Sequence, residues 1–396
     1  MTLEFKKISK IFTQISTQAA ARQERIDAVV PRVWQILQEH ALDTDLRDHA
    51  QAVATEQKWR GAIPTKDPLD LIQDLPEQPP RYTIIAGDGS QIYPDLHGAV
   101  LYYLINVGTI VYRYGSGSAP TTETTPTICY ESDMEFDQEE QSVLVPSTAE
   151  VDARRSLAEI EKLCELARTE PNTAPKLVLM DGQMAFFASS FAMSKQLADR
   201  MLHDYLHRLD ELRANQVPVA GFFSRRKSMM VTSLARLAIS PIRPDQAVPA
   251  TPPFDSVPDT AIFAAKLGPG QRSAVFEIAA RWNIDVYRRK QHSIHFFYVN
   301  VGSAARPEIA RIEAPEWVVA NRAMLDLIHS AAVAQSKPAA GYPYVLSRAH
   351  EIAVVREEEQ ATLEEMLLGR LAAQGIYLFP SGKTRAKEVL VSDTRT

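Results

Sequence analysis

The chain has 396 residues, of which 45% are hydrophobic and 23% are charged, an ordinary composition for a globular protein of one large domain or two smaller ones. Its two cysteines, Cys129 and Cys164, are not part of a CxxC motif. They cannot form a zinc site and give no sign of a disulfide framework. No stretch approaches the ~20 apolar residues that a membrane span needs. We therefore expect a cytoplasmic protein that has no contact with a membrane.

The formal net charge of −6 argues against a protein that coats nucleic acid over its whole surface. It does not exclude a nuclease, because a carboxylate site carries negative charge that its metal ions neutralise only when they are bound.

Apolar residues recur at helical spacing from about Phe5 to Val53 and predict one long or broken helix. Many polar residues stand between them, so the apolar stripe must pack on the main domain or on a second copy of the chain. We assign residues 1–75 to an N-terminal helical region that serves dimerisation and residues 76–396 to the main domain.

The main domain begins with predicted strands. Arg81 to Gln91 is expected to be a short strand that ends in a turn at Asp88-Gly, and residues 99–107 and 109–114 are expected to form a following hairpin. The stretch from Gly115 to Thr127 is rich in Ser, Thr, Pro and Gly, a composition typical of a mobile loop.

Strands and helices then alternate along the chain. Ser147 and Glu150 are spaced like a capping box, which predicts a helix from there to about Arg168. The later predicted elements are a buried strand at 176–181, a helix at 194–214, a strand at 217–223 and a helix after Ser224. This alternation predicts a sheet with helices on its faces.

The last third of the chain opens with six prolines between Ser240 and Asp259, which predict an excursion or linker at about 240–259. The elements expected after it are strands at 285–287 and 294–301 and helices at 315–333 and 347–374.

Two predicted strands each end in Asp-Gly, at Asp88 and Asp181. Open α/β sheets place their sites at the carboxyl ends of strands, so we expect both carboxylates at one edge of the sheet. The glycine after each aspartate permits a sharp turn and leaves room for a metal ion or a phosphate. Asp-Gly is also a common turn, so neither motif is decisive by itself.

Hard oxygen ligands of this kind suit Mg²⁺ or Mn²⁺, and two such ions ~4 Å apart can activate water and stabilise the leaving oxygen in phosphodiester cleavage. The helix between the two strands offers a third carboxylate from Glu159, Glu161 or Glu165. Glu159 and Glu161 lie on opposite flanks of the apolar stripe, so helical phase does not choose between them. Each is also compatible with a solvated surface position.

Further candidates lie outside the carboxylates. Tyr342 and His350 flank a proline-containing turn that leads into a helix, where His350 can bind metal or move a proton, or simply pack beside Ala349. The basic run best placed for DNA phosphates is Arg225, Arg226 and Lys227, with Arg288, Arg289 and Lys290 as a second candidate. Either run can equally be a solvated turn. His292 and His295 are expected to point to opposite faces of a strand and not to share a metal ion.

These motifs occur in a distinctive order along residues 80–355. They are strand-Asp88-Gly-Ser-Gln, a hairpin, Arg155-x-x-x-Glu159 on a helix, Leu-Val-Leu-Met-Asp181-Gly, and late Tyr342-Pro-Tyr with Ala349-His350. The order resembles the NurA nuclease family. The chain departs from the family pattern at Met184, where a smaller or aliphatic residue is usual, and in its long proline-rich excursion.

The resemblance implies an RNase H-like α/β core with a mixed central sheet flanked by helices. It implies a homodimeric deoxyribonuclease that depends on Mn²⁺ or Mg²⁺, degrades DNA from 5′ ends and has some endonuclease action on single strands. It also implies a partnership with the hexameric HerA ATPase in DNA end resection during double-strand break repair.

The same resemblance assigns roles to residues of this chain. Asp88 and Asp181 are expected to be the principal metal ligands. Glu159 is expected to be the helix carboxylate, chosen over Glu161 because it follows Arg155 by four residues. Tyr342 and His350 are expected to complete the site, with His350 as a ligand or proton carrier.

Two other functions remain open from the sequence. An actin-like ATPase also begins with a strand, an Asp-Gly-Ser turn and a hairpin, but it needs glycine-rich phosphate loops, and this chain has only 16 Gly, about 4% against a usual ~7%. A non-catalytic RNase H-like adaptor of a DNA translocase has no reason to keep all four candidate metal ligands. Their joint presence favours catalysis.

Overall fold

The computed structural model describes residues 5–56, 59–130, 134, 136–137, 142–187, 193–224, 227–240, 254 and 257–378. The chain divides into two compact units. The first unit comprises Met1–Pro79, Gly182–Met184 and Ala220–Pro343, and the second comprises Pro80–Asp181, Ala185–Val219 and Tyr344–Thr396. Within the described ranges, no helix combines the length and the apolar character that crossing a membrane requires.

The first unit begins with two helices, α1 (Phe5–Glu39) and α2 (Thr44–Glu56), so the predicted N-terminal helix exists in its broken form. Helix α1 packs against α5 (Met230–Ile239) and α6 (Asp259–Ala264). Among the side chains of α1 that the structure describes, the buried apolar ones lie at or beyond Ile26. Nearer its start, α1 instead carries three apolar side chains that are about half exposed, namely Ile11, Phe12 and Ile15.

The strands of the first unit pair antiparallel in the order β1-β9-β10-β11-β8. Their bounds are β1 (Gly61–Pro64), β9 (Phe276–Ala279), β10 (Ile294–Asn300), β11 (Ile309–Pro315) and β8 (Val219–Ser224). Helices α6 and α8 (Arg322–Ser336) pack against β10, and α2 and α5 pack against β1. Strand β1 was not among the predicted elements.

Two predicted elements of the first unit need correction. The strand expected at 285–287 is wrong, because these residues belong to a π-helical turn, η2 (Asn283–Tyr287), followed by the 3-10 turn η3 (Arg288–Lys290). The Asn283 amide holds this turn by donating to the carbonyls of Ile278 and Ile294 at 3.0 and 3.1 Å. The single helix expected at 315–333 is broken into α7 (Glu316–Val319) and α8, because the Asn321 side chain accepts from the first amides of α8 and caps it.

Most of the predicted proline-rich excursion lies outside the described residues. At its end, the buried Asp259 side chain accepts hydrogen bonds from the Met230 and Thr232 amides at 2.8 and 2.9 Å. These are amides of the first turn of α5, so Asp259 caps a helix that precedes it in the chain.

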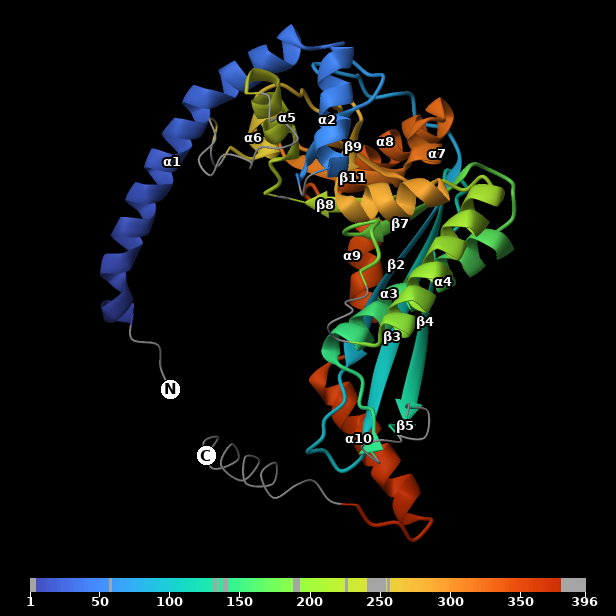
Figure 1. The fold of residues 1–396 in the computed structure, drawn as a ribbon. Coiled ribbons are helices and arrows are strands. Elements are labelled where there is room, and N and C mark those ends of the chain that lie inside the picture. Colours follow the sequence, from blue (N-terminus) through green and yellow to red (C-terminus); the bar gives the residue numbers. More distant parts are fainter. Residues whose placement is uncertain are drawn as a thin grey trace. The chain divides into compact units, whose positions relative to one another are not determined.

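The second unit contains a mixed sheet in the order β7-β2-β3-β4 (Figure 1). The strands are β2 (Tyr82–Ile92), β3 (Tyr102–Tyr114), β4 (Thr121–Tyr130) and β7 (Lys176–Asp181). Strands β2, β3 and β4 form an antiparallel meander, and β7 lies parallel to β2 on its other side. A separate two-stranded ribbon consists of β5 (Phe136–Asp137) and β6 (Ser142–Val143).

Three sequence predictions about this meander are wrong. Strand β2 does not turn at Asp88-Gly89, because β3 pairs with it along its whole length and sets Asp88 opposite Gly108. Residues 99–107 and 109–114 are not two strands of a hairpin, since Gly108 lies inside the single strand β3. The mobile loop expected from Gly115 to Thr127 ends before Thr121, where β4 begins. The β-branched threonines of β4 suit an exposed edge strand, and an edge strand also tolerates Pro126.

The helices of the second unit largely follow the sequence pattern. Helix α3 (Thr148–Thr169) has the predicted Ser147 cap, which accepts from the Glu150 amide at 3.1 Å, and α4 (Lys195–Ala214) is capped by Ser194. The single helix predicted at 347–374 is instead α9 (Tyr344–Ala353) and α10 (Glu357–Ala372). Both α3 and α9 contact strands β2, β3 and β7, so the sheet is flanked by helices as expected.

Candidate active site

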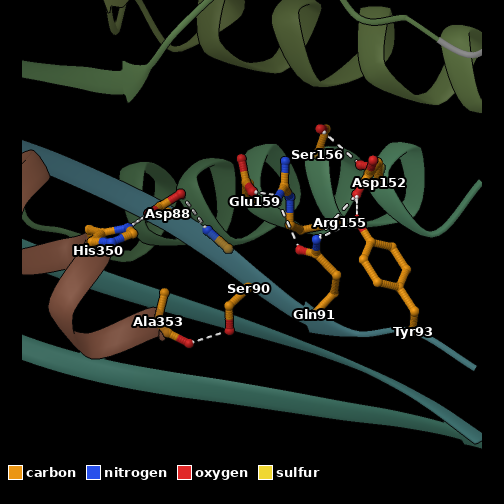
Figure 2. Close-up of polar contacts among 11 residues, drawn as sticks. Asp88, Ser90, Gln91, Tyr93, Asp152, Arg155, Ser156, Glu159, His350 and Ala353 are labelled. Atoms are coloured by element: carbon orange, nitrogen blue, oxygen red, sulfur yellow. Dashed lines mark hydrogen bonds and ion pairs between the residues drawn. The ribbon is translucent and has the colours of Figure 1, made fainter. Parts of the chain in front are cut away.

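Strand β2 presents its side chains alternately to two helices (Figure 2). Ser90 lies on the α9 side, where its hydroxyl donates to the Ala353 carbonyl at 2.5 Å. Gly89 lies on the α3 side, where a Cβ atom on this residue would come within 2.4 Å of Glu159 Oε1. Because successive residues of a strand point to opposite faces, β2 is clasped between α3 and α9 at Asp88-Gly89-Ser90.

The two predicted aspartates are neighbours on parallel strands. Strand β2 pairs with β7 in a register whose last pair is Gly87 with Met180. The next residue on each strand is Asp88 and Asp181, respectively, so the two carboxylates stand beside each other on the same side of the sheet. Gly182 follows with a φ of +82°, so the expected turn after Asp181 is present.

His350 contacts Asp88 directly. Its Nδ1 lies 2.6 Å from Asp88 Oδ2, while the other carboxylate oxygen of Asp88 accepts from the Gly89 amide at 2.9 Å. Helix α9 reaches this position because Gly108, the β3 partner of Asp88, has no side chain. A Cβ atom there would come within 2.4 Å of the Ala353 nitrogen.

Glu159 extends the group of carboxylates from the α3 side. It is buried, and its Oε1 lies 3.2 Å from Arg155 Nε in an ion pair that lacks hydrogen-bond geometry. The pKa of Glu159 is raised to about 8, chiefly by burial; the charge of Arg155 opposes this shift, and the charges of Asp88 and Asp181 add to it. The three carboxylates therefore interact, and Glu159 Oε1 has no hydrogen-bond partner in the described part of the chain.

The other two glutamates of α3 face elsewhere. Glu161 pairs with Arg208 of α4 at 3.2 Å, and Glu165 pairs with Lys162 at 3.3 Å. Glu159 is the one that lies against β2, where a Cβ atom on Gly89, the residue after Asp88, would come within 2.4 Å of its Oε1. Its role as a metal ligand stays a prediction.

A polar network beside Glu159 was not predicted. Arg155 donates to the Gln91 Oε1 at 2.9 Å, and Gln91 donates to the Tyr93 hydroxyl, which in turn donates to Asp152 Oδ1, both at 2.7 Å (Figure 2). The signal was present in the sequence. Asp152, Arg155 and Glu159 share one helical face, and Gln91 alternates onto the same side of β2 as Gly89.

The remaining candidates belong to the first unit or lie outside the described residues. Tyr342 is in the first unit, where its ring meets Phe222 edge-on with centroids 5.7 Å apart. Lys227 is exposed, and Arg225 and Arg226 fall outside the described residues. In the second basic run, Arg288 pairs with Glu277 at 2.7 Å. The roles proposed for Tyr342 and the 225–227 run stay predictions.

The two histidines set aside from the sequence do not face a common ligand. His292 Nδ1 lies 3.2 Å from the Trp317 Nε1 donor, whereas His295 Nδ1 lies 3.1 Å from the Ser293 carbonyl oxygen.

The three carboxylates are of the ligand type that divalent cations prefer, but their side chains are not yet arranged around a common point. Among the described residues, no set of three or more His, Cys, Asp or Glu side chains is already placed to hold a metal ion. Asp88 and Asp181 nevertheless each repel the charged form of Glu159, and one buried oxygen of Glu159 makes no hydrogen bond in the described part of the chain. A hard divalent cation relieves such repulsion and accepts oxygen ligands of this kind.

Comparison with known proteins identifies the family. The model of the NurA domain matches residues 82–355. The chain belongs to the NurA family. No curated protein sequence matches it.

Solved structures are similar to the chain as well. The NurA nuclease from Sulfolobus solfataricus is 12% identical, with 94% of this chain and 98% of that chain covered and a TM-score of 0.51, which shows a shared fold. The catalytic domain of human Endonuclease V is 13% identical, with 81% and 96% covered and a TM-score of 0.33. The predicted fold class, α/β with a mixed sheet flanked by helices, is confirmed by the strands and helices described above and by the fold shared with the Sulfolobus structure.

Proposed function

We propose that this member of the NurA family is a metal-dependent deoxyribonuclease that hydrolyses DNA phosphodiesters at Asp88, Asp181 and Glu159. One observation carries the proposal: Asp88 and Asp181 stand side by side on parallel strands, and a third carboxylate, the buried Glu159, reaches β2 at the neighbouring Gly89 with an oxygen that makes no hydrogen bond in the described part of the chain. Mutual repulsion of carboxylates destabilises the fold, so a protein keeps such a cluster mainly where a ligand binds to it. Clusters of this kind therefore mark functional sites.

Each residue has a role in this proposal. Asp88, Asp181 and Glu159 hold Mn²⁺ or Mg²⁺, which when bound lowers the pKa of water and neutralises charge on the scissile phosphate. Asp88 orients the His350 ring through the 2.6 Å contact, so that the ring's other nitrogen is available to a metal ion or a proton. Arg155 offsets part of the negative charge around Glu159.

Finer aspects of the function rest on the family resemblance. We propose 5′-to-3′ exonuclease and single-strand endonuclease activity in DNA end resection with a HerA-type hexameric ATPase, in the cytoplasm. DNA phosphates contact Arg225, Arg226 and Lys227. A homodimer forms through residues 1–75, and the exposed apolar side chains near the start of α1 support this assignment because water contact with them is unfavourable.

The alternative is an RNase H-like adaptor that does not cut DNA. The absence of a ready-made metal site among the described residues is compatible with it. An actin-like ATPase finds no support in the family match.

The test is cleavage of end-labelled single- and double-stranded DNA by the purified chain with Mn²⁺, Mg²⁺ or EDTA, beside the Asp88→Ala variant. We expect cleavage that depends on the metal and is lost in Asp88→Ala, with circular dichroism unchanged. Cleavage that persists in EDTA or in the variant contradicts the assignment of the site. A chain that binds DNA but cuts nothing with either metal, alone or with a HerA-type ATPase, is an adaptor.

A further inference from the structure

The first unit contains a cavity of about 300 Å³, a volume at the lower end of small-molecule sites. Its wall includes the segment that follows β1, the residues just before β9, and the start of α8. All its lining residues belong to the first unit, whereas the carboxylates of the proposed nuclease site belong to the second.

An incompletely paired buried cation, Arg272, lines this cavity. The residue is 1% exposed, and its main chain is fixed by two 2.9 Å hydrogen bonds with Gln73. One guanidinium nitrogen donates to the Ser273 carbonyl at 2.8 Å, while Nε has no partner among the described residues. The Asp67 carboxylate is 3.9 Å away, beyond hydrogen-bond distance.

Asp67 is also engaged by the main chain, since its Oδ2 accepts from the Val275 amide at 3.1 Å. Burial lowers the pKa of Arg272. The charge of Asp67 partly opposes this shift, and the charge of Arg322 adds to it. A buried guanidinium in such surroundings is costly unless an anion shares the site.

The rest of the lining narrows the kind of anion. Lys66 and Arg322 add two cations that solvent can reach, and Arg322 is itself held by Asp326 at 2.7 Å. Val275, Val319, Ala320 and Leu325 form an apolar wall. Glu316 supplies a carboxylate that can accept hydrogen bonds from the N–H groups of a nucleobase. A simple inorganic anion would gain nothing from this carboxylate.

We infer that this cavity binds a small phosphate-bearing ligand of mononucleotide size, with its phosphate on Arg272 and its base against the apolar wall. Arginine is suited to phosphate because its planar fork donates two parallel hydrogen bonds to the oxygens. The site is additional to the proposed nuclease centre and does not depend on it.

The experiment is calorimetric titration of the full chain with 5′-dAMP, inorganic phosphate and deoxyadenosine, all in EDTA so that no metal ion recruits phosphate to the carboxylates. We expect 5′-dAMP to bind measurably more tightly than either fragment. Deoxyadenosine or phosphate binding as tightly as 5′-dAMP, or no binding of 5′-dAMP at millimolar concentration, overturns the inference.

Variants locate the binding. Arg272→Gln is expected to weaken 5′-dAMP binding about tenfold or more, the effect of removing a charge-assisted hydrogen bond. Arg322→Ala is expected to weaken it severalfold. Arg281→Ala is the matched control, because Arg281 and Arg322 are 58% and 60% exposed and each pairs with an aspartate four residues later, yet Arg281 does not line the cavity.

Asp88→Ala separates this site from the nuclease centre. It is expected to leave 5′-dAMP binding unchanged, whether or not the chain cuts DNA. Binding that is lost in Asp88→Ala and unaffected by Arg322→Ala places the ligand at the carboxylates and overturns the inference. If circular dichroism shows that Arg272→Gln does not fold, the comparison of Arg322→Ala with Arg281→Ala decides.

Discussion

Each unit buries a glutamate beside an arginine, and the two pairs differ in what else surrounds the carboxylate. In the first unit, Glu313 lies 2.9 Å from Arg311, both are almost fully buried, and a second oxygen of Glu313 accepts from the Met184 amide at 3.2 Å. In the second unit, Glu159 meets Arg155 but also faces Asp88 and Asp181.

The difference separates two uses of a buried charge. Around Glu313, the Arg311 guanidinium and the Met184 amide meet the carboxylate, and the guanidinium stacks 3.9 Å over the Phe296 ring, although its Nε and Nη2 make no hydrogen bond among the described residues. Around Glu159, burial raises the pKa and two like charges add to the shift, and one of its oxygens is left without a hydrogen bond among the described residues. We infer that the first pair serves the fold and that the second is held ready for a cation.

The largest expected effect is on catalysis. Glu159→Gln keeps the side-chain shape but removes a charged ligand, so DNA cleavage is expected to fall by about 10³-fold, equivalent to about 4 kcal/mol of barrier. Glu161→Gln is the control, because it makes the same substitution on the same helix at a glutamate that pairs with Arg208. This variant is expected to keep its activity. Equal losses in the two variants would mean that α3 contributes charge in general and not a ligand.

The next largest effect is on stability in the first unit. Glu313→Gln leaves Arg311 buried without its counter-charge, which is expected to cost about 3–5 kcal/mol of folding free energy. Urea denaturation measures this cost. Asp285→Asn, which breaks an exposed pair with Arg281, is the control and is expected to change stability by less than about 1 kcal/mol. A Glu313→Gln chain as stable as the parent would show that the buried pair is dispensable.

Stability of the apo chain should respond to pH through Glu159. Its folded pKa of about 8 exceeds the ordinary value of 4.5, so the contribution is fully present below pH 4.5 and is lost as pH rises through 8. Each pKa unit corresponds to about 1.4 kcal/mol. In EDTA, Glu159→Gln is therefore expected to be more stable than the parent at pH 8.5, by roughly 2 kcal/mol, but not at pH 4.5. A stability difference that is the same at both pH values would remove this account of the site.

A smaller effect is expected from packing at the strand. In Gly89→Ala the new methyl group meets Glu159 Oε1 and Arg155 Cγ at 2.4 and 2.6 Å, so the helix must shift, at a cost of about 1–3 kcal/mol together with lost cleavage. Gly369→Ala in α10 has no atom within 4 Å and is expected to stabilise the helix by about 0.5–1 kcal/mol. Full activity in Gly89→Ala would show that the close approach of α3 is not required.

The candidate site was largely predictable because its carboxylates carry local signals. Asp181 follows a short apolar strand, a signal that depends only on nearby residues, whereas Glu159 was preferred to Glu161 only through the family resemblance. Asp88 was proposed on the basis of the wrong local structure, since it lies inside a strand and not at a turn. Pairing with β3 overrides the turn propensity of Asp88-Gly89. The sequence analysis did not foresee this pairing, because it divided β3 into two strands at Gly108.

What escaped prediction depends on how elements pack. The network from Arg155 to Asp152 through Gln91 and Tyr93 exists only because α3 lies against β2; periodicity places these side chains on one helical face and one strand face but does not reveal that the two faces meet. The π-helical turn at 283–287 depends on the Asn283 side chain reaching carbonyls on both sides of it. Neither arrangement leaves a mark in the spacing of apolar residues.

The clasp of β2 between two helices makes the site sensitive to insertion and deletion in a particular way. Adding or removing one residue between Tyr82 and Asp88 would exchange the two faces of everything that follows, turning the aspartate toward α3 and the glycine toward α9. The edge strand β4 pairs with a neighbour on one side only, and it meets α3 through the exposed ion pair of Glu123 with Lys162, so it should absorb a change of length more readily. Evolution of this protein is therefore expected to alter the rim of the sheet freely while conserving the count of residues along its central strand.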